Sequence, residues 1–463
     1  MRRRLLTDRT SAGDGPLWLR FRRNLSIGLL GSVLSVAVRL AQTALLAKAL
    51  SIDDFGRVLI VTNLFVFLEA FVGLRVSDLV FRLFQPLEER GDARALQGLL
   101  LLSLALSLAT GLVVGVGVFA LSPWISGRFY GGVELAPLFK IYACAAVPSA
   151  LREVYEPVLR IRDRFTSVVV PQVLGGLATF AILAAYLLKT DPYDLRVVVA
   201  AFAVGVFVQT LPPLASALRL MRASLVGIEV GAAARSLGKY RRELWGTLFH
   251  SNVSGYLKFA VNPGDVFLLG LFSGPAQVAL YGLARQLTAP LALLQTNAQT
   301  AVAPEVMSLV AARRFAQLRR LVGRYVTAAA AVGVFAVACG LTLGGFVINL
   351  LSRPEYAPAL PVFYVLLIAS SLMLAAVVFR PASVGLDLMR WYNAGLLLSA
   401  CVVFAFVLAG GLDARRMAYA QLFGALIVRV ACNVPVWARL RALAPRSGKT
   451  TREESGEVVT ESK

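Results

Sequence analysis

The sequence is poor in the residues that most enzymes use for catalysis and metal binding, because its 463 residues include one histidine and four cysteines. Charged residues are also scarce at 16%, whereas 58% of the residues are hydrophobic and the mean hydropathy is +0.71. A chain of this composition has too little polar surface to stay dissolved in water as a globular domain. The single histidine, His250, argues against histidine-based proton relays, zinc sites and Ser-His-Asp triads.

The four cysteines lie in separate apolar runs, and none belongs to a CxxC pair or a Cys/His cluster. This spacing favours small buried hydrophobic residues over metal ligands. A Walker A motif is also absent, so direct ATP hydrolysis is not expected. The sequence predicts no metal, no cofactor and no enzyme activity.

Long apolar runs fill the chain from residue 25 to residue 437. Each run is about twenty residues long, which is enough to cross a hydrocarbon core of roughly 30 Å as an α-helix. The fold class predicted is therefore an all-α, polytopic membrane protein. Its twelve expected spans are 25–48, 58–81, 98–122, 141–159, 167–188, 197–218, 246–271, 278–304, 325–350, 359–380, 391–411 and 417–437.

Basic residues indicate the orientation of these spans. With the N-terminus in the cytoplasm, the cytoplasmic segments hold 31 of the 47 Lys and Arg residues, and the outside loops hold 8. All five tryptophans lie near predicted span ends, which is typical of membrane interfaces. We expect a multi-pass protein of the cytoplasmic (inner) membrane with both termini in the cytoplasm. The membrane surface also explains the net charge of +21 without a nucleic-acid partner.

The longest cytoplasmic connection divides the spans six and six. Sliding the second half back by 223 residues places 46–58 on 269–281, and each segment contains the end of a first span, a turn and the start of a second. Two halves with the same orientation follow from this offset. The expected parts are a basic tail (1–24), an N-lobe (25–218), a linker (219–245), a C-lobe (246–437) and a C-terminal tail expected to be disordered (438–463).

Polar residues in the first and seventh spans recur at intervals of three and four, so each set follows one helical face. The first set is Ser32, Ser35, Arg39 and Gln42, and the second is Ser251, Ser254, Lys258, Asn262 and Asp265. An ionisable group inside a span is costly and is retained best where it faces water, substrate or a partner. The two stripes therefore predict a shared wet cavity.

Other intramembrane charges leave structural and functional interpretations open. Arg75, Asp78 and Arg82 share one face near Glu69, which suits either a helix-stapling ion pair or a functional site. Arg152, Glu156 and Arg160 form a self-compensating ladder, for which we favour a structural role.

The segment Asn262-Pro263-Gly264-Asp265 combines a missing backbone donor, a flexible residue and a carboxylate. It is expected either to hold a cation or proton, or to form a kink at which the helix bends.

The run NPGDVFLLGLFSGPAQVALYGLARQL (262–287), followed by TAVAPEVMSL (300–309), resembles the polysaccharide (O-antigen type) flippases of the multidrug/oligosaccharidyl-lipid/polysaccharide exporter superfamily. The first half agrees, because RNLSIGLLGSVLSVAVRLAQTALLAKALSIDDFGRVL (23–59) ends in an L-x-x-x-D-F-G turn. The resemblance covers about residues 24–437. It implies two six-helix lobes around a central cavity, and transport of a polyprenyl-diphosphate-linked oligosaccharide by alternating access for surface polysaccharide biosynthesis.

An anionic headgroup needs cations inside the cavity, and five basic residues are the candidates. They are Arg39, Arg75, Lys258, Arg285 and Arg380. The candidates for coupling to an H+ or Na+ gradient are Asp78, Asp265 and Glu69, and Gln42, Asn262, Pro263 and Gly264 are expected to supply polar or bending positions. Membrane lipids and a polysaccharide polymerase are the other implied partners.

Two further transporters of the same superfamily remain as alternatives, namely a drug/cation antiporter and a lipid II flippase. The antiporter would favour acidic cavity walls, and the lipid II flippase typically has two additional spans. A membrane polysaccharide polymerase or ligase is the alternative of another class. It would need a sizeable outside loop with catalytic residues, whereas the outside loops predicted here are short.

Overall fold

The computed structural model describes residues 15–130, 132, 134–190, 192–225, 229–261 and 264–443. All regular structure in these residues is helical, which confirms the all-α prediction. The helices are α1 (Gly15–Ala49), α2 (Ile52–Val72), α3 (Val76–Glu89), α4 (Ala93–Tyr130), α5 (Ala136–Ala143), α6 (Ala146–Ile161), α7 (Thr166–Leu187), α8 (Leu195–Leu225), α9 (Val230–Gly238), α10 (Arg241–Val261), α11 (Gly264–Phe272), α12 (Pro275–Leu287), α13 (Ala289–Ala311), α14 (Phe315–Leu351), the 3-10 helix η2 (Pro354–Tyr356), α15 (Ala359–Ala376), α16 (Phe379–Gly385), α17 (Met389–Leu408) and α18 (Ala414–Leu443).

Nine segments of the described chain are long and apolar enough to cross a membrane as one helix. The three other predicted spans coincide with pairs of shorter helices, namely α5 with α6, α10 with α11, and α12 with α13. The count of twelve crossings therefore stays a prediction. A membrane protein tolerates such interruptions where the freed backbone groups are buried in protein or line a cavity.

The second predicted span, 58–81, differs most from the observed helices. Helix α2 begins six residues earlier, at Ile52, because the Ser51 hydroxyl accepts a hydrogen bond from the Asp54 N–H at 3.2 Å and caps the helix N-terminus. The helix ends at Val72, and α3 starts anew at Val76. Arg75 is the N-cap residue of α3. The break therefore places this cation between the C-terminus of α2 and the N-terminus of α3.

The helix starts repeat along the chain at the interval of 223 residues that was predicted by placing 46–58 on 269–281. Helix α2 begins at Ile52 and α12 at Pro275, which is 223 positions later. The same interval separates the start of α5 from that of α15, and the start of α7 from that of α17. The two longest helices, α4 and α14, have 38 and 37 residues and occupy equivalent places in the two halves. Each is roughly 55 Å long at 1.5 Å per residue.

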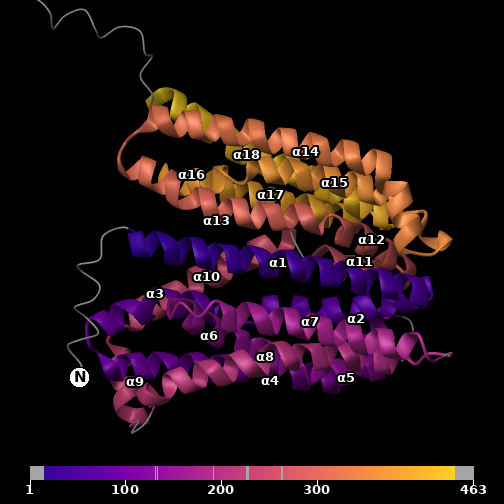
Figure 1. Ribbon diagram of the computed structural model, residues 1–463, viewed down its shortest axis with the longest axis horizontal. Coiled ribbons are helices and arrows are strands. Elements are labelled where there is room, and N and C mark those ends of the chain that lie inside the picture. Colours follow the sequence, from indigo (N-terminus) through magenta and orange to yellow (C-terminus); the bar gives the residue numbers. More distant parts are fainter. Residues whose placement is uncertain are drawn as a thin grey trace, which may run out of the picture.

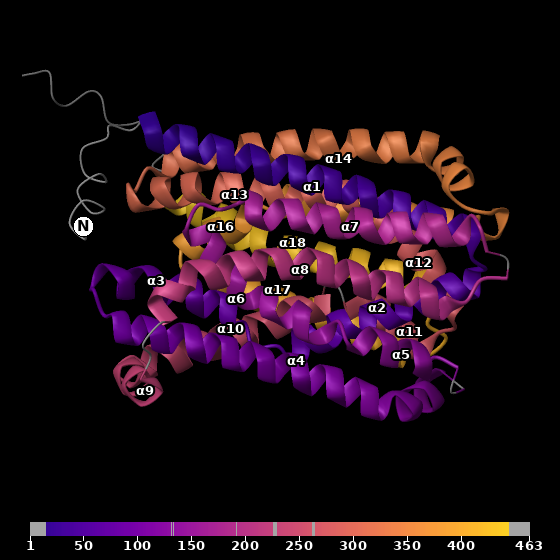
Figure 2. The same cartoon turned by 60° about the horizontal axis from the view of Figure 1, so that its bottom comes forward.

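Figure 1 shows the two halves as two layers of roughly parallel helices, with α13 to α18 in orange and yellow above and α2 to α8 in purple and magenta below. Helix α1 packs mainly on α7 of its own half and also contacts α12, α13 and α14 of the other. Figure 2 shows the same helices after a 60° turn, with α9 at one end of the molecule. Helix α10 contacts α3 on one side and α17 on the other.

The buried apolar residues form three clusters, and their distribution shows where the halves are joined. One cluster contains residues of both halves, such as Phe55 beside Tyr356 and Val58 with Tyr281. The second contains only residues from Val76 to Leu248, and the third only residues from Val306 to Leu440. The halves therefore share one core near the α1–α2 turn, whereas at the other end one cluster lies near α3, where Leu248 is its residue from the second half, and another lies near α16.

Close backbone packing joins the two halves at the shared end. A Cβ placed on Gly56 would lie 1.9 Å from the Pro275 carbonyl oxygen, so α2 and α12 meet where glycine makes room. The Arg353 guanidinium donates hydrogen bonds to the carbonyl oxygens of Lys48 at 2.7 Å and Ala49 at 3.2 Å. This end of the molecule is closed.

Candidate transport cavity

Three cavities lie between and within the halves, and they share lining residues. We name them the inter-lobe cavity (about 590 Å³), the N-lobe pocket (about 390 Å³) and the C-lobe pocket (about 390 Å³). Val66 lines the inter-lobe cavity and the N-lobe pocket, and Met373 lines the inter-lobe cavity and the C-lobe pocket. Arg39, Asn63 and Gln286 line both lobe pockets. Because they share these lining residues, the three cavities adjoin one another.

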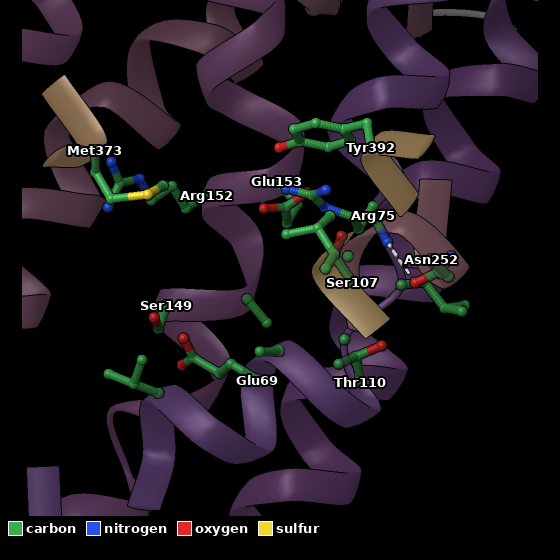
Figure 3. A pocket seen from close by; sticks show the side chains of 17 residues that line it. Glu69, Arg75, Ser107, Thr110, Ser149, Arg152, Glu153, Asn252, Met373 and Tyr392 are labelled. Atoms are coloured by element: carbon green, nitrogen blue, oxygen red, sulfur yellow. Dashed lines mark hydrogen bonds between the residues drawn. The ribbon is translucent and has the colours of Figure 1, made fainter. Parts of the chain in front are cut away.

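The inter-lobe cavity is lined by residues from both halves, as Figure 3 shows. Glu69 comes from the end of α2, Arg75 from the α2–α3 break, and Asn252 from α10. The Arg75 backbone N–H donates to Asn252 Oδ1 at 3.3 Å, which ties the break to the second half. The Arg75 side chain lies over Gly255, where an added Cβ would come within 3.0 Å of Arg75 Cδ.

The carboxylates of the inter-lobe cavity already have partners. Glu153 Oε2 accepts from the backbone N–H and the hydroxyl of Ser77, at 3.2 and 2.6 Å, and so caps the start of α3. Figure 3 shows the Glu69 and Ser149 side chains next to each other. Glu153 therefore helps to hold α3 on α6, and Glu69 of α2 lies beside α6.

Arg152 of α6 lines the same cavity, and the sequence analysis did not select it. Its Nε donates to Glu156 Oε2 at 2.7 Å, and Glu156 also pairs with Arg160, so the predicted ladder is present. The Arg152 side chain is nevertheless 48% exposed. A signal was available, because Arg152 follows Ser149 by three positions on one helical face.

The N-lobe pocket is formed by α1, α2, α7 and α8 with Tyr142 of α5, and Gln286 of α12 is added from the second half. The predicted stripe of the first span faces it, since Ser35, Arg39 and Gln42 all line the pocket. Gln42 is 8% exposed and its Nε2 donates to the Gly176 carbonyl oxygen at 2.7 Å. Gln42 thus positions α1 against α7, and Arg39 lies one turn away.

The C-lobe pocket contains a buried ion pair. Asp265 is 3% exposed, and its Oδ1 accepts from the Arg285 guanidinium. Its Oδ2 accepts from the Tyr281 hydroxyl at 2.5 Å. From the sequence, Arg285 is expected to bind the substrate and Asp265 to couple transport to an ion, and the structure brings the two side chains into one ion pair. Gly264 precedes Asp265 at the start of α11 and is buried as well.

Three of the described predicted site residues line none of these three cavities, and Gly264 is one of them. Asp78 lies in the first turn of α3, and the ion pair near it joins Arg82 to Glu243 at 3.6 Å instead. Arg380 lies in α16, close to Tyr392, which does line the inter-lobe cavity. The Lys258 side chain and residues Asn262 and Pro263 lie outside the described residues. The predicted kink at 262–263 and the predicted meeting of Arg39 with Lys258 stay predictions.

The cations of the cavities differ in their pairing. Arg285 is paired with Asp265, and Arg152 with Glu156. Within the described part of the chain, no carboxylate forms an ion pair with the side chain of Arg39 or of Arg75. A guanidinium facing a cavity without a counter-ion can take a bidentate carboxylate or phosphate. The arrangement suits an anionic ligand.

Comparison with known families gives one match. Residues 45–361 match the family described as "Polysaccharide biosynthesis protein". No curated protein matches the chain. The matched segment includes α2 to α14 and therefore most of the residues that line the three cavities.

Solved structures with this fold are transporters. A multidrug resistance transporter of the MATE family, in an inward-facing conformation, gives a TM-score of 0.68 at 14% identity, covering 88% of this chain and 95% of that one. The lipid II flippase MurJ in an inward closed conformation gives 0.66 at 10% identity, covering 89% of each chain. A MOP superfamily transporter from Pyrococcus furiosus gives 0.59 at 16% identity, covering 91% and 96%. These likenesses establish the two-lobe transporter fold.

Proposed function

The chain belongs to the polysaccharide biosynthesis protein family of the multidrug/oligosaccharidyl-lipid/polysaccharide (MOP) exporter superfamily, and we propose that it moves a polyprenyl-diphosphate-linked oligosaccharide across the cytoplasmic membrane by alternating access. The observation that carries the proposal is the pair of arginines, Arg39 and Arg75, that face the cavities without an ion-pair partner in the described residues. Two phosphates on a lipid carrier are the kind of ligand that such guanidinium groups bind. A drug cation would be repelled by the same groups.

The cores of the two halves support alternating access as the mechanism. The halves share a core at the α1–α2 turn, and at the other end the buried apolar residues divide into two clusters, near α3 and near α16. With both termini in the cytoplasm, as the charge bias predicts, the shared end faces outward and the inter-lobe cavity opens inward. Separating the shared end and closing the other would expose the same arginines to the outer side.

Two of the three carboxylates predicted for ion coupling lie where transport could affect them. Glu69 lines the inter-lobe cavity, and Asp265 lines the C-lobe pocket with Arg285. Binding H+ or Na+ at Asp265 would weaken its hold on Arg285 and free a third cation for the diphosphate. We propose this exchange as the coupling step, and Asp78, which lines none of the three cavities, as the weakest of the three candidates.

Arg39→Ala tests the proposed function directly. Losing one charge-assisted hydrogen bond to phosphate costs roughly 1.5–3 kcal/mol, which is a factor of ten or more in affinity. We expect Arg39→Ala to cripple export of the lipid-linked glycan, and Arg39→Lys to retain part of it because the charge survives while the planar fork is lost. The measurement is the amount of lipid-linked glycan that accumulates on the cytoplasmic face of cells.

The matched control is Arg320→Ala, which removes an exposed arginine of α14 that lines none of the three cavities. All variants are compared at equal protein abundance in the membrane. Normal export by a well-expressed Arg39→Ala variant would show that the cavity does not bind its ligand through this charge, and the anionic-substrate proposal would fail.

A further inference from the structure

The N-lobe pocket has a different chemistry from the other two cavities. Arg39 is the only charged residue among its lining residues, and five other lining residues carry a carboxamide side chain. The carboxamides are Gln42, Asn63, Gln172, Gln209 and Gln286. Hydroxyls of serine and threonine and the backbone of Gly175 and Gly176 complete the polar wall. Carboxamides and hydroxyls both donate and accept hydrogen bonds, which is what a ligand rich in uncharged hydroxyl groups requires.

Gln286 is the residue that connects this pocket to the second half. It is the penultimate residue of α12, and α12 is held close to α2 because Gly282 leaves room for Leu59. A Cβ on Gly282 would lie 2.4 Å from Leu59 Cδ1. This packing brings Gln286 to the boundary of the N-lobe and C-lobe pockets, both of which Arg39 and Asn63 also line.

The Gln286 amide nitrogen is buried and has no hydrogen-bond partner among the described residues. A buried donor without a partner costs about 1–3 kcal/mol. Two other amide nitrogens of the pocket do have acceptors. Gln42 Nε2 donates to the Gly176 carbonyl oxygen, and Asn63 Nδ2 donates to the Leu59 carbonyl oxygen at 2.8 Å. A second buried amide nitrogen without a partner among the described residues is that of Gln421, which lines the C-lobe pocket together with Gln286.

We propose that the N-lobe pocket is a subsite for the uncharged hydroxyl groups of the carried sugar, with Gln286 as a specificity-determining residue. The proposal rests on the proposed function. It assigns the diphosphate of the ligand to an arginine and the sugar of the ligand to carboxamides. Arg39, at the junction of the two lobe pockets, holds the diphosphate, and the first sugar, which is bonded to that diphosphate, reaches the carboxamides of Gln286 and Gln172. A sugar hydroxyl then accepts the hydrogen bond that Gln286 Nε2 lacks.

Two binding measurements on the purified full-length protein separate sugar recognition from headgroup recognition. The first probe is a long-chain polyprenyl diphosphate without sugars. The second is the lipid-linked oligosaccharide extracted from cells depleted of this protein. We expect Gln286→Leu to bind the sugar-free lipid as the native chain does and to bind the glycolipid about three- to tenfold more weakly, which is the loss of one or two neutral hydrogen bonds.

Gln172→Leu, on the α7 wall of the pocket, is the second variant and should show the same selective loss. Gln317→Leu removes an exposed carboxamide at the start of α14 and should change neither affinity. Arg39→Ala should weaken both probes, because both carry the diphosphate.

The outcomes distinguish this inference from the proposed function. Equal binding of both probes by the native chain and by both pocket variants would overturn the sugar subsite and leave the proposed function standing. An equal loss of both probes in the two leucine variants would also overturn it, since the residues would then act on the fold. Failure of the native chain to bind either probe would overturn the proposed function itself.

Discussion

At the scale of residues, the Asp265–Arg285 pair joins two residues that the sequence indicated only as separate charges. Helical spacing identified each of them as an intramembrane charge, and it could not show that α11 and α12 bring them into contact. Asp265 also accepts from the Tyr281 hydroxyl, so its two carboxylate oxygens are both occupied. Breaking a buried pair on one side leaves an uncompensated charge and costs more than removing both partners.

A double-mutant cycle at this pair should therefore be strongly non-additive. We expect Asp265→Ala to destabilise the protein by about 3 kcal/mol, at the low end of the cost of breaking a buried pair because Arg285 is 29% exposed. The double variant Asp265→Ala/Arg285→Met should regain much of this loss. The measurement is thermal unfolding of the purified variants, and additive losses in the double variant would show that the two side chains do not interact.

Sequence periodicity was sufficient for residues on one helix and failed for sites assembled from several. Ser35, Arg39 and Gln42 line one pocket because α1 is a regular helix there. Arg152 was predicted to form an ion-pair ladder with Glu156, and this ladder is present. Arg152 also lines the inter-lobe cavity, which the helical spacing alone did not indicate. Gln286 was not selected because nothing local to α12 indicates that Gly282 and Leu59 bring it against the first half.

At the scale of elements, the crossing of α2 and α12 closes one end of the molecule. The two helices approach until Gly56 touches the Pro275 carbonyl, and the cluster around Phe55 and Tyr356 continues from one half to the other. A side chain at Gly56 cannot be accommodated by rotating a neighbour, because the obstacle is backbone. The contact therefore sets the separation of the halves at this end.

Gly56→Val should hold this end partly open. We expect a larger and broader distance between spin labels at Asp53 and Glu355, two exposed positions on opposite halves near the crossing. Gly117→Val, in α4, is the control, since an added Cβ there meets no atom within 4 Å. An unchanged distance distribution in Gly56→Val would mean that the α2–α12 contact does not determine closure.

The helix boundaries were predicted less well than the all-α, multi-pass kind of fold. Hydropathy marks where the chain is apolar, whereas helix starts depend on capping, as Ser51 shows for α2. Helix α4 begins five residues before and ends eight residues after the predicted span 98–122, and α14 begins ten residues before the predicted span 325–350. The break at Arg75 has no strong breaker, apart from Gly73, that a sequence pattern would reveal.

At the scale of the whole molecule, the repeat of 223 residues is the feature that sequence and structure express most clearly. Polar stripes suggested it, and the starts of α2 and α12, of α5 and α15, and of α7 and α17 follow it. Two similar halves that share a core at one end and separate at the other can exchange which end is joined with little change inside each half. This is the arrangement that moving a headgroup across a membrane requires.

The most direct test of the account is transfer of the glycolipid between leaflets by the purified chain. Liposomes carrying the lipid-linked oligosaccharide extracted from depleted cells are treated with periodate, which oxidises sugar diols and crosses bilayers poorly. With the native chain inserted, we predict that the glycan of both leaflets becomes oxidised, whereas Arg39→Ala liposomes retain the inner-leaflet fraction much longer. Folded native chain that leaves the inner-leaflet glycan as protected as it is in protein-free liposomes would contradict the account.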